Sequence, residues 1–250
     1  MDGVELPAWS DALLAGARAA GEDVAAGVEL ARKYGSALPQ PGAGATATRW
    51  QLLAAVAAQD LTAARILEAH SDALAILAEA GDRQSEGTWG VFAAEAPGGR
   101  LTATDVGDGS WLDGTKPWCS LAGHLDGALV TAHVGASRGL FAVDLRHPSV
   151  RVEAASVWVS RGLRTVTSAP VHFEHTPARP VGAPGWYLTR PGFAWGGMGV
   201  AACWFGASTA LAETLRTAAA RKGGDVAALH VGVVDVALHA AAATLLQAAR

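Results

Sequence analysis

The segment WLDGTKPWCS, from Trp111 to Ser120, does more than any other stretch to decide the expected fold. Asp113-Gly114 is a two-residue turn signal between apolar runs, so a tight turn is predicted there. The residues beyond the turn are expected to form a strand, on which Trp118 and Ser120 stand two positions apart. An indole and a small hydroxyl would then face a common cleft.

The segments on either side of this stretch also have the composition of strands. They are short, rich in β-branched and aromatic residues, and separated by Gly, Pro or Asp. Six or seven such strands predict a central β domain over residues 88–188, folded as a small barrel or sandwich. The other segments are GVFAAE (90–95), RLTATDV (100–106), ALVTAHV (128–134), GLFAVDL (139–145), VRVEAASVWV (150–159) and APVHFEH (169–175).

The residues before the strands have helical patterning. Ser10 is placed to cap a helix that runs to Tyr34, and LPQPGAG (38–44) is a Pro/Gly linker. Thr48 and a Gln three residues later form a capping-box pattern that opens a second apolar run, stopped by Gly81. Asp60 could restart a helix inside that run, so one long helix and two shorter ones both remain open. Residues 1–87 are therefore expected to form an N-terminal helical domain.

The residues after the strands turn helical again, over about Trp195 to Arg221 and Val226 to Arg250. Helices, then strands, then helices predict an α+β class, because alternating elements would be needed for a doubly wound sheet. The last helix has no Gly C-cap and no Pro stop, and a two-helix hairpin exposes much apolar surface. We therefore expect the C-terminal bundle, residues 189–250, to be incomplete or completed by another chain.

Composition narrows the possible functions. The 250 residues carry a net charge of −4 with scattered Lys and Arg, which gives no basic footprint for nucleic acid. No run approaches the ~20 uninterrupted apolar residues of a membrane span, and MDGVELPAWSDALL lacks the pattern of a secretory signal. The two cysteines, Cys119 and Cys203, fit reduced thiols. We expect a soluble cytoplasmic protein without a nucleic-acid or membrane partner.

Two further motifs are interpreted as structural. GASRG (135–139) matches the pattern of a nucleophile elbow, but the strand-like GLFAVDL overlaps its end, so a hairpin turn at Ser137 is predicted instead. The eight His residues lack metal-ligand spacing, and no metal site is expected.

Three motifs, in their order and spacing, resemble the acyl-CoA dehydrogenase family of flavoproteins. They are GVFAAEAPGG (90–99), WLDGTKPWCS and GLRTVTSAPVHFEHTPA (162–178). The resemblance reaches from about Trp50 to Arg250 and implies the same order of helical, β and helical domains. It also implies an FAD cofactor, an acyl-CoA or related thioester as substrate, and α,β-desaturation as the reaction. An oligomer, of this chain alone or with a related subunit, is implied as well.

The resemblance assigns roles to individual residues. Trp118 would lie against the flavin ring, and Ser120 would approach the flavin N5 that accepts hydride. Arg221 would reach the FAD pyrophosphate of a neighbouring subunit, and Arg100 would pair with a CoA phosphate. Backbone groups of three residues in the first motif would line the flavin: Val91, Ala93 and Ala94.

The sequence departs from the family where chemistry is concerned. Ala94 stands where a Thr is common, and Gly99-Arg100 replaces a Gly-Ser pair. Desaturation needs a carboxylate to remove the α-proton, yet no Asp or Glu occurs from Tyr187 through Ala212. No catalytic base is therefore assigned. Two alternatives stay open: a non-catalytic subunit of a mixed assembly, and a flavin monooxygenase on the same scaffold, which needs no such base.

Overall fold

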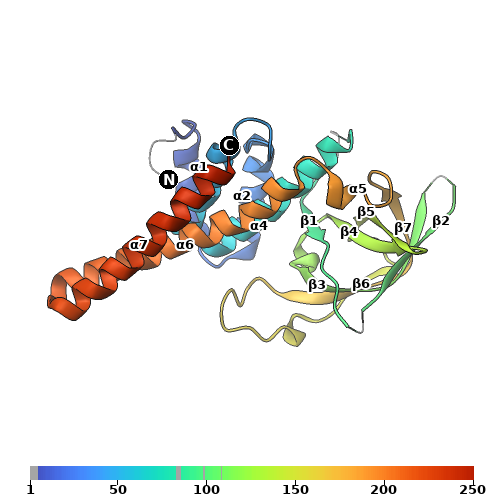
Figure 1. The fold of residues 1–250 in the computed structure, drawn as a ribbon. Coiled ribbons are helices and arrows are strands. Elements are labelled where there is room, and N and C mark those ends of the chain that lie inside the picture. Colours follow the sequence, from blue (N-terminus) through green and yellow to red (C-terminus); the bar gives the residue numbers. More distant parts are fainter. Residues whose placement is uncertain (1–4, 83–85, 98, 108) are drawn as a thin grey trace.

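The computed structural model describes residues 5–82, 86–97, 99–107 and 109–250. Helices come first in the chain, strands follow, and helices end it, so the expected α+β class is confirmed. The strands gather at one end of the molecule, and the long helix α6 (Phe193–Lys222) runs from them along the other helices (Figure 1).

Four helices form the N-terminal part: α1 (Ser10–Ala20), α2 (Val24–Tyr34), α3 (Thr46–Gln59) and α4 (Leu61–Glu79). The prediction of one helix from Ser10 to Tyr34 is wrong. Gly21 adopts a φ of 52°, which ends α1, and the Asp23 carboxylate accepts two backbone N–H bonds that start α2. Asp60 caps α4 in the same way, through the N–H of Ala63, so the second apolar run is two helices.

The helices pack around buried apolar residues and a buried ionic group. Trp50 is fully buried, and its Nε1 donates to the Trp195 carbonyl at 3.2 Å, which ties α3 to α6. Arg190 is 3% exposed and pairs with Asp72 at 3.4 Å and Glu79 at 3.2 Å. Because both carboxylates belong to α4, Arg190 fixes the segment before α6 onto the N-terminal helices.

The β domain is a closed barrel with two further strands attached. The strands are β1 (Trp89–Phe92), β2 (Leu101–Asp105), β3 (Ser110–Ser120), β4 (Gly127–Val134), β5 (Ser137–Asp144), β6 (Val150–Val152) and β7 (Ser168–Pro180). Their order is β1-β4-β2-β3-β7-β5, and β5 also pairs with β4, which closes a ring of five strands. β1 joins β4 in parallel, and β6 joins β7 from outside. The strand expected over residues 150–159 is shorter than predicted, since a 3-10 turn (Ala155–Val157) replaces its second half.

The turn predicted at Asp113-Gly114 is wrong. β3 runs through both residues and pairs with β2 on one side and β7 on the other. Gly114 has a φ of 118°, and a Cβ added there would lie 2.1 Å from the Arg100 carbonyl oxygen. A shift in the β3–β7 register falls at this point, so the glycine serves a β-bulge and a close strand approach. The hairpin predicted at Ser137 is confirmed, since Val134 pairs with Ser137 across the turn.

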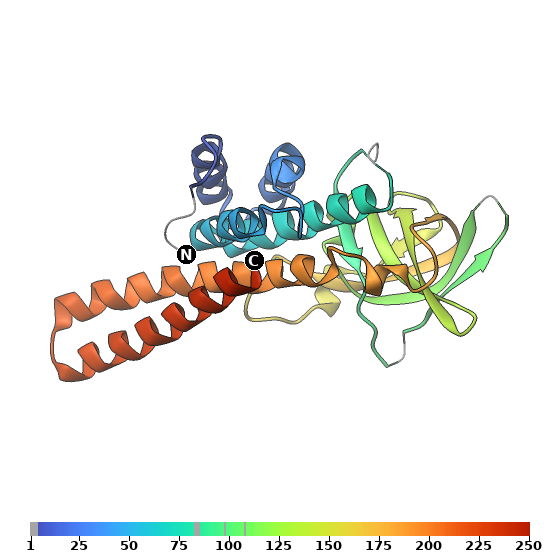
Figure 2. The ribbon, with the colours of Figure 1, turned by 45° about the horizontal axis from the view of Figure 1, so that its top comes forward.

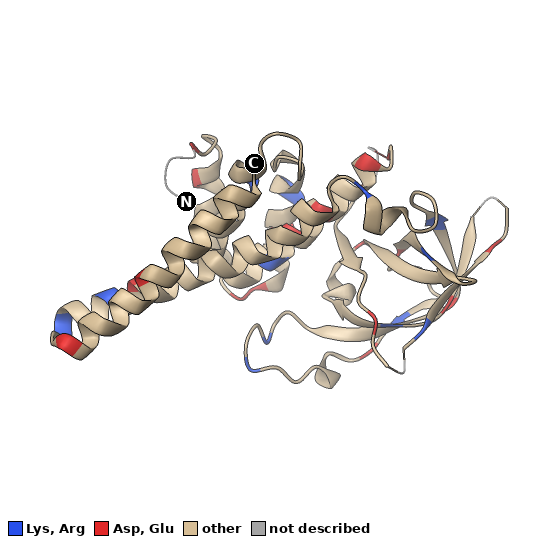
Figure 3. Ribbon diagram, viewed as in Figure 1, with Lys and Arg blue, Asp and Glu red and all other residues tan. Residues whose placement is uncertain are grey.

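The C-terminal hairpin of α6 and α7 (Asp225–Ala248) extends far beyond the other helices before α7 returns toward them (Figure 2). α7 is long and apolar enough, by length and composition alone, to cross a membrane, with a mean hydropathy of 1.7 over a window of which none is buried. Four of its exposed apolar residues follow a heptad-like spacing: Val226, Leu229, Val233 and Val236. Charged residues are sparse along α7 and gather near the hairpin tip (Figure 3).

Candidate functional site

A cavity of about 350 Å³ lies where the helices meet the β domain, and we call it the junction cavity. Its walls come from α4, β1, the end of β3, the segment before β7, and α6. Two residues expected at a flavin, Val91 and Ser120, line it. Ser120 and Ser168 are register partners on β3 and β7, which explains how residues 48 positions apart meet at one end of the cavity.

The polar groups of the junction cavity are few. The hydroxyls of Ser120 and Ser168 are hydrogen-bonded at 2.7 Å. Trp158 Nε1 is buried and has no hydrogen-bond partner among the described residues. A buried donor without an acceptor costs about 1–3 kcal/mol, so this N–H is available to an acceptor atom that enters the cavity.

The remaining wall is apolar and aromatic. Trp89, Trp158 and Trp204 all line the cavity, together with Leu and Val side chains. Such a surface suits a flat ring system, because aromatic faces stack with offset planes over a large area. Arg65 is the charged residue in the wall, and it pairs with Glu68 one turn along α4. Burial raises the pKa of Glu68, while Arg65 opposes that effect.

Carboxylates are missing from this wall. None of the described residues that line the junction cavity is Asp or Glu. The result agrees with the acid-free start of α6 in the sequence. Within the described ranges, no group of three or more His, Cys, Asp or Glu side chains is placed to hold a metal ion.

Trp118 does not take the place expected of it. The β3–β7 register shifts between Lys116 and Cys119, and Trp118 adopts a left-handed φ of 54° at that bulge. Its side chain is 51% exposed and stands outside the wall of the junction cavity. A left-handed non-glycine residue costs about 1–3 kcal/mol and often marks a functional position. The indole therefore offers an open surface, although not beside Ser120 in one cavity.

The other expected site residues lie elsewhere. Ala93 and Ala94 line a second cavity, next to Arg138 and beyond the end of β1. Arg100 is exposed just before β2, and Arg221 lines an open groove on α6. Gly98 of the first motif lies outside the described residues. Of the seven residues assigned to the flavin or substrate, the structure thus brings Val91 and Ser120 together in the junction cavity, and Ala93 and Ala94 together in the second cavity.

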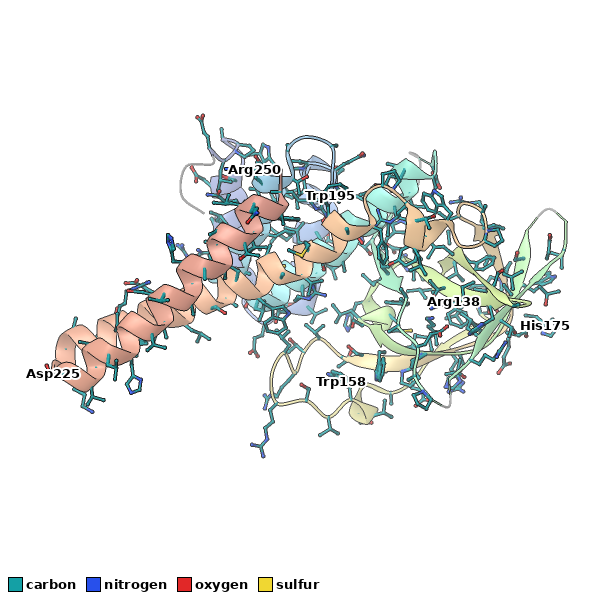
Figure 4. The ribbon with its side chains drawn as sticks, viewed as in Figure 1. Arg138, Trp158, His175, Trp195, Asp225 and Arg250 are labelled. Carbon is teal, nitrogen blue, oxygen red and sulfur yellow. The ribbon has the colours of Figure 1, made fainter. Side chains whose placement is uncertain are left out.

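Sequence reasoning missed Trp158 and Ser168. Trp158 was placed inside the strand expected over residues 150–159, whereas it follows a 3-10 turn, on an irregular segment (Figure 4), and lines the cavity. The residues that follow this Trp, including Ser160, Gly162 and Leu163, show neither helical nor strand periodicity. That lack of a period was the sequence signal of a loop. Ser168 could have been found through the pairing of the second and third motifs.

No family model matches this chain, and no curated protein matches it. Three solved structures with a similar fold are each below 25% identical, so the likeness shows the fold alone. KijD3, solved with FMN and a dTDP-linked keto sugar, is 18% identical with a TM-score of 0.73, covering 96% of this chain and 71% of that one. TdsC from Paenibacillus sp. A11-2, solved with FMN and indole, is 16% identical with a TM-score of 0.71, covering 95% and 74%. An FAD-dependent dehydrogenase is 18% identical with a TM-score of 0.78, covering 99% and 79%.

Proposed function

We propose that the protein is a flavin-dependent oxidoreductase and that the flavin ring occupies the junction cavity. The observation that carries the proposal is that the unpartnered Trp158 Nε1 and the Ser120–Ser168 hydroxyl pair belong to the same cavity lining, which also contains three indoles. A flavin ring is flat and carries several nitrogen and oxygen acceptors at its edge. The structural relatives solved with FMN, and the relative described as FAD-dependent, support the same cofactor class.

The size of the junction cavity fits this assignment. About 350 Å³ lies at the lower end of small-ligand pockets, which accommodates a ring system but not a whole FAD. The sugar-phosphate part would extend outside. We therefore propose a flavin without a choice between FMN and FAD, although the sequence resemblance favours FAD.

Each group in the wall has a separate task. A bound flavin supplies the redox chemistry, by accepting or giving an electron pair. Trp158 Nε1 and the Ser120 hydroxyl would donate hydrogen bonds to acceptor atoms of the ring, and so fix its orientation. Ser168 holds the Ser120 hydroxyl, while Leu121 and Leu125 exclude water from the ring.

The acid-free wall bears on the reaction type. Acyl-CoA desaturation needs a carboxylate base at the substrate α-carbon, and the described lining residues contain none. We infer that oxygenation of a small substrate by reduced flavin and O2 fits this chain better. TdsC is described as a dibenzothiophene monooxygenase. Desaturation of an acyl-CoA is the second candidate, and it requires a base from a partner subunit.

Flavin titration tests the proposal. We expect FMN or FAD to bind saturably with one flavin per chain, and the flavin absorbance bands to shift on binding. Trp158→Phe removes one donor, which is worth about 0.5–1.5 kcal/mol or roughly a 2- to 13-fold weaker Kd. Trp111→Phe, on an exposed part of β3 outside the cavity wall, is the matched control and should bind as wild type.

Two results would argue against this assignment. If neither FMN nor FAD binds at high micromolar concentration, the protein does not use a flavin cofactor. If the Trp158→Phe and Trp111→Phe variants bind flavin with equal affinity, the flavin binds at a site other than the junction cavity. For the reaction type, transfer of one oxygen atom from O2 into an added small substrate, with the flavin reduced by an external reductant and no acyl-CoA present, would support oxygenation. Flavin reduction by acyl-CoA after addition of a second subunit would support desaturation.

We also propose that a helical partner chain, a second copy or a related subunit, covers the apolar stripe of α7. The support is the heptad-like spacing of exposed residues from Val226 to Val236. Asp235 lies near the middle of α7 and pairs with Arg216 of α6. Charged groups at the centre of a bilayer cost about 3 kcal/mol each or more, which favours a protein partner over a membrane.

A further inference from the structure

The second cavity, of about 610 Å³, is separate from the junction cavity, and we call it the hairpin cavity. It is lined by the turn between β4 and β5, by Ala93 and Ala94, and by the short helix α5 (Trp186–Thr189) with Phe193 after it. Figure 4 shows Arg138 among the strands, well away from Trp158. The two cavities share no lining residue.

The walls of the hairpin cavity are held in place from both sides. Gly185 donates its backbone N–H to the Arg138 carbonyl at 2.8 Å, which ties the segment before α5 to β5. The Tyr187 and Phe193 rings pack edge-to-face with centroids 5.3 Å apart. The buried Arg190 lies over the Tyr187 ring at 5.8 Å while it pairs with α4. A pocket held this way is preformed, so little ordering cost is left for binding.

Positive charge lies at and behind one wall of the hairpin cavity: Arg138 lines the cavity, and Lys116 lies outside the lining, behind Thr131. Lys116 is 2% exposed, and its Nζ donates to the carbonyl and the hydroxyl of Thr131 at 2.9 and 2.8 Å. Arg138 donates to the same hydroxyl at 2.9 Å and to the Ala93 carbonyl at 3.0 Å. Glu95 is the carboxylate beside this pair, and its Oε1 lies 3.1 Å from Arg138 Nε and 3.1 Å from His133 Nε2.

The guanidinium has donor capacity left over. Arg138 Nε lies within ion-pair distance of Glu95 but is not aligned for a hydrogen bond. No hydrogen bond to Arg138 Nη1 occurs within the described part of the chain. Arg138 is the cation that lines the cavity, and a guanidinium presents a planar pair of donors that matches a carboxylate or phosphate.

We propose that the hairpin cavity is a binding site for an amphipathic anion, whose carboxylate or phosphate meets Arg138 and whose apolar body lies against Tyr187, Leu188 and Phe193. The apolar walls exclude a small inorganic ion as the whole ligand, since they would stay unfilled. The positive charge of Arg138 disfavours a cationic head group. The inference does not depend on a flavin in the junction cavity.

Calorimetric titration of the full chain with octanoate, octan-1-ol and octylamine tests this site. Octanoate should bind saturably, at least tenfold tighter than octan-1-ol, and octylamine should not bind. Arg138→Leu should weaken octanoate binding at least tenfold and bring it close to that of octan-1-ol. Equal affinity for octanoate and octan-1-ol in the wild type would overturn the proposal, because the charged head would then contribute nothing.

A second pair of variants tests the site even if Arg138→Leu fails to fold. Leu188 is 55% exposed at the hairpin cavity, so Leu188→Asp is expected to fold, with a carboxylate that repels the ligand. Leu211→Asp, on a 72% exposed position of α6, is the matched control. Octanoate affinity should fall at least fivefold in Leu188→Asp and stay unchanged in Leu211→Asp. Unchanged affinity in Leu188→Asp would place the octanoate elsewhere.

Discussion

The buried His70 should make the stability of this fold depend on pH. Its side chain is on α4, 3% exposed, and Nδ1 accepts the backbone N–H of Trp89 at 3.1 Å. Nδ1 must be unprotonated to accept that bond, which holds the start of β1 beside the junction cavity. Burial lowers the pKa of His70 to about 4, helped by the positive charge of Arg32 and opposed by Asp126.

The sign and size of the effect follow from this pKa. In the unfolded chain His70 has a pKa of about 6.5, so between pH 6.5 and 4 the unfolded state binds more protons. The contribution to stability is complete above pH 6.5 and is lost as the pH falls toward 4. Linkage gives a loss of about 2 kcal/mol between pH 7 and pH 5, and about 3 kcal/mol by pH 4.

Urea unfolding at pH 7 and pH 5 measures this loss. The variant His70→Gln keeps an acceptor for the Trp89 N–H but cannot be protonated. Its free energy of unfolding should therefore fall about 2 kcal/mol less than that of the wild type between pH 7 and pH 5. His230→Gln, exposed on α7, should follow the wild type. If His70→Gln and the wild type lose the same free energy of unfolding between the two pH values, His70 is not the buried neutral group described here.

Three further predictions concern the helices and the cysteines. Burial raises the pKa of both Cys119 and Cys203 to about 12, so a thiol reagent at pH 8 should modify neither in the folded chain and both in guanidinium chloride. A Cβ at Gly206 would lie 2.0 Å from a backbone oxygen of α3, whereas Gly232 has open space around it. Gly206→Ala should therefore lower the free energy of unfolding by about 1–3 kcal/mol, and Gly232→Ala should raise it by up to ~1 kcal/mol. Val233→Asp on the α7 stripe should shift the chain from oligomer to monomer in sedimentation, and an unchanged mass would refute the partner surface.

The sequence predicted the local elements better than their long-range contacts. Apolar periodicity located most of the helices and strands, because it reports on each segment's own buried face. Asp113-Gly114 misled the prediction, since a glycine with positive φ serves a bulge as well as a turn. The difference lies in the neighbouring strand, whose Arg100 carbonyl approaches Gly114 too closely for a Cβ. No local pattern contains that information.

In the candidate site, too, local features were predicted better than long-range contacts. The resemblance assigned Val91 and Ser120 to one flavin site, and both line the junction cavity, although their contact with a flavin stays a prediction. Trp118 turned outward because of a bulge one residue before the buried Cys119. Trp158 reaches the cavity from an irregular segment between β6 and β7, where no periodic pattern marks the position of a side chain.

A crystal structure of the full chain grown with FMN and with FAD is the most direct test of the central claim. We expect density for a flat three-ring system in the junction cavity, with acceptor atoms within hydrogen-bond distance of Trp158 Nε1 and the Ser120 hydroxyl. Clear flavin density at another place, with water or side chains filling the space between Trp158 and Ser120, would contradict it.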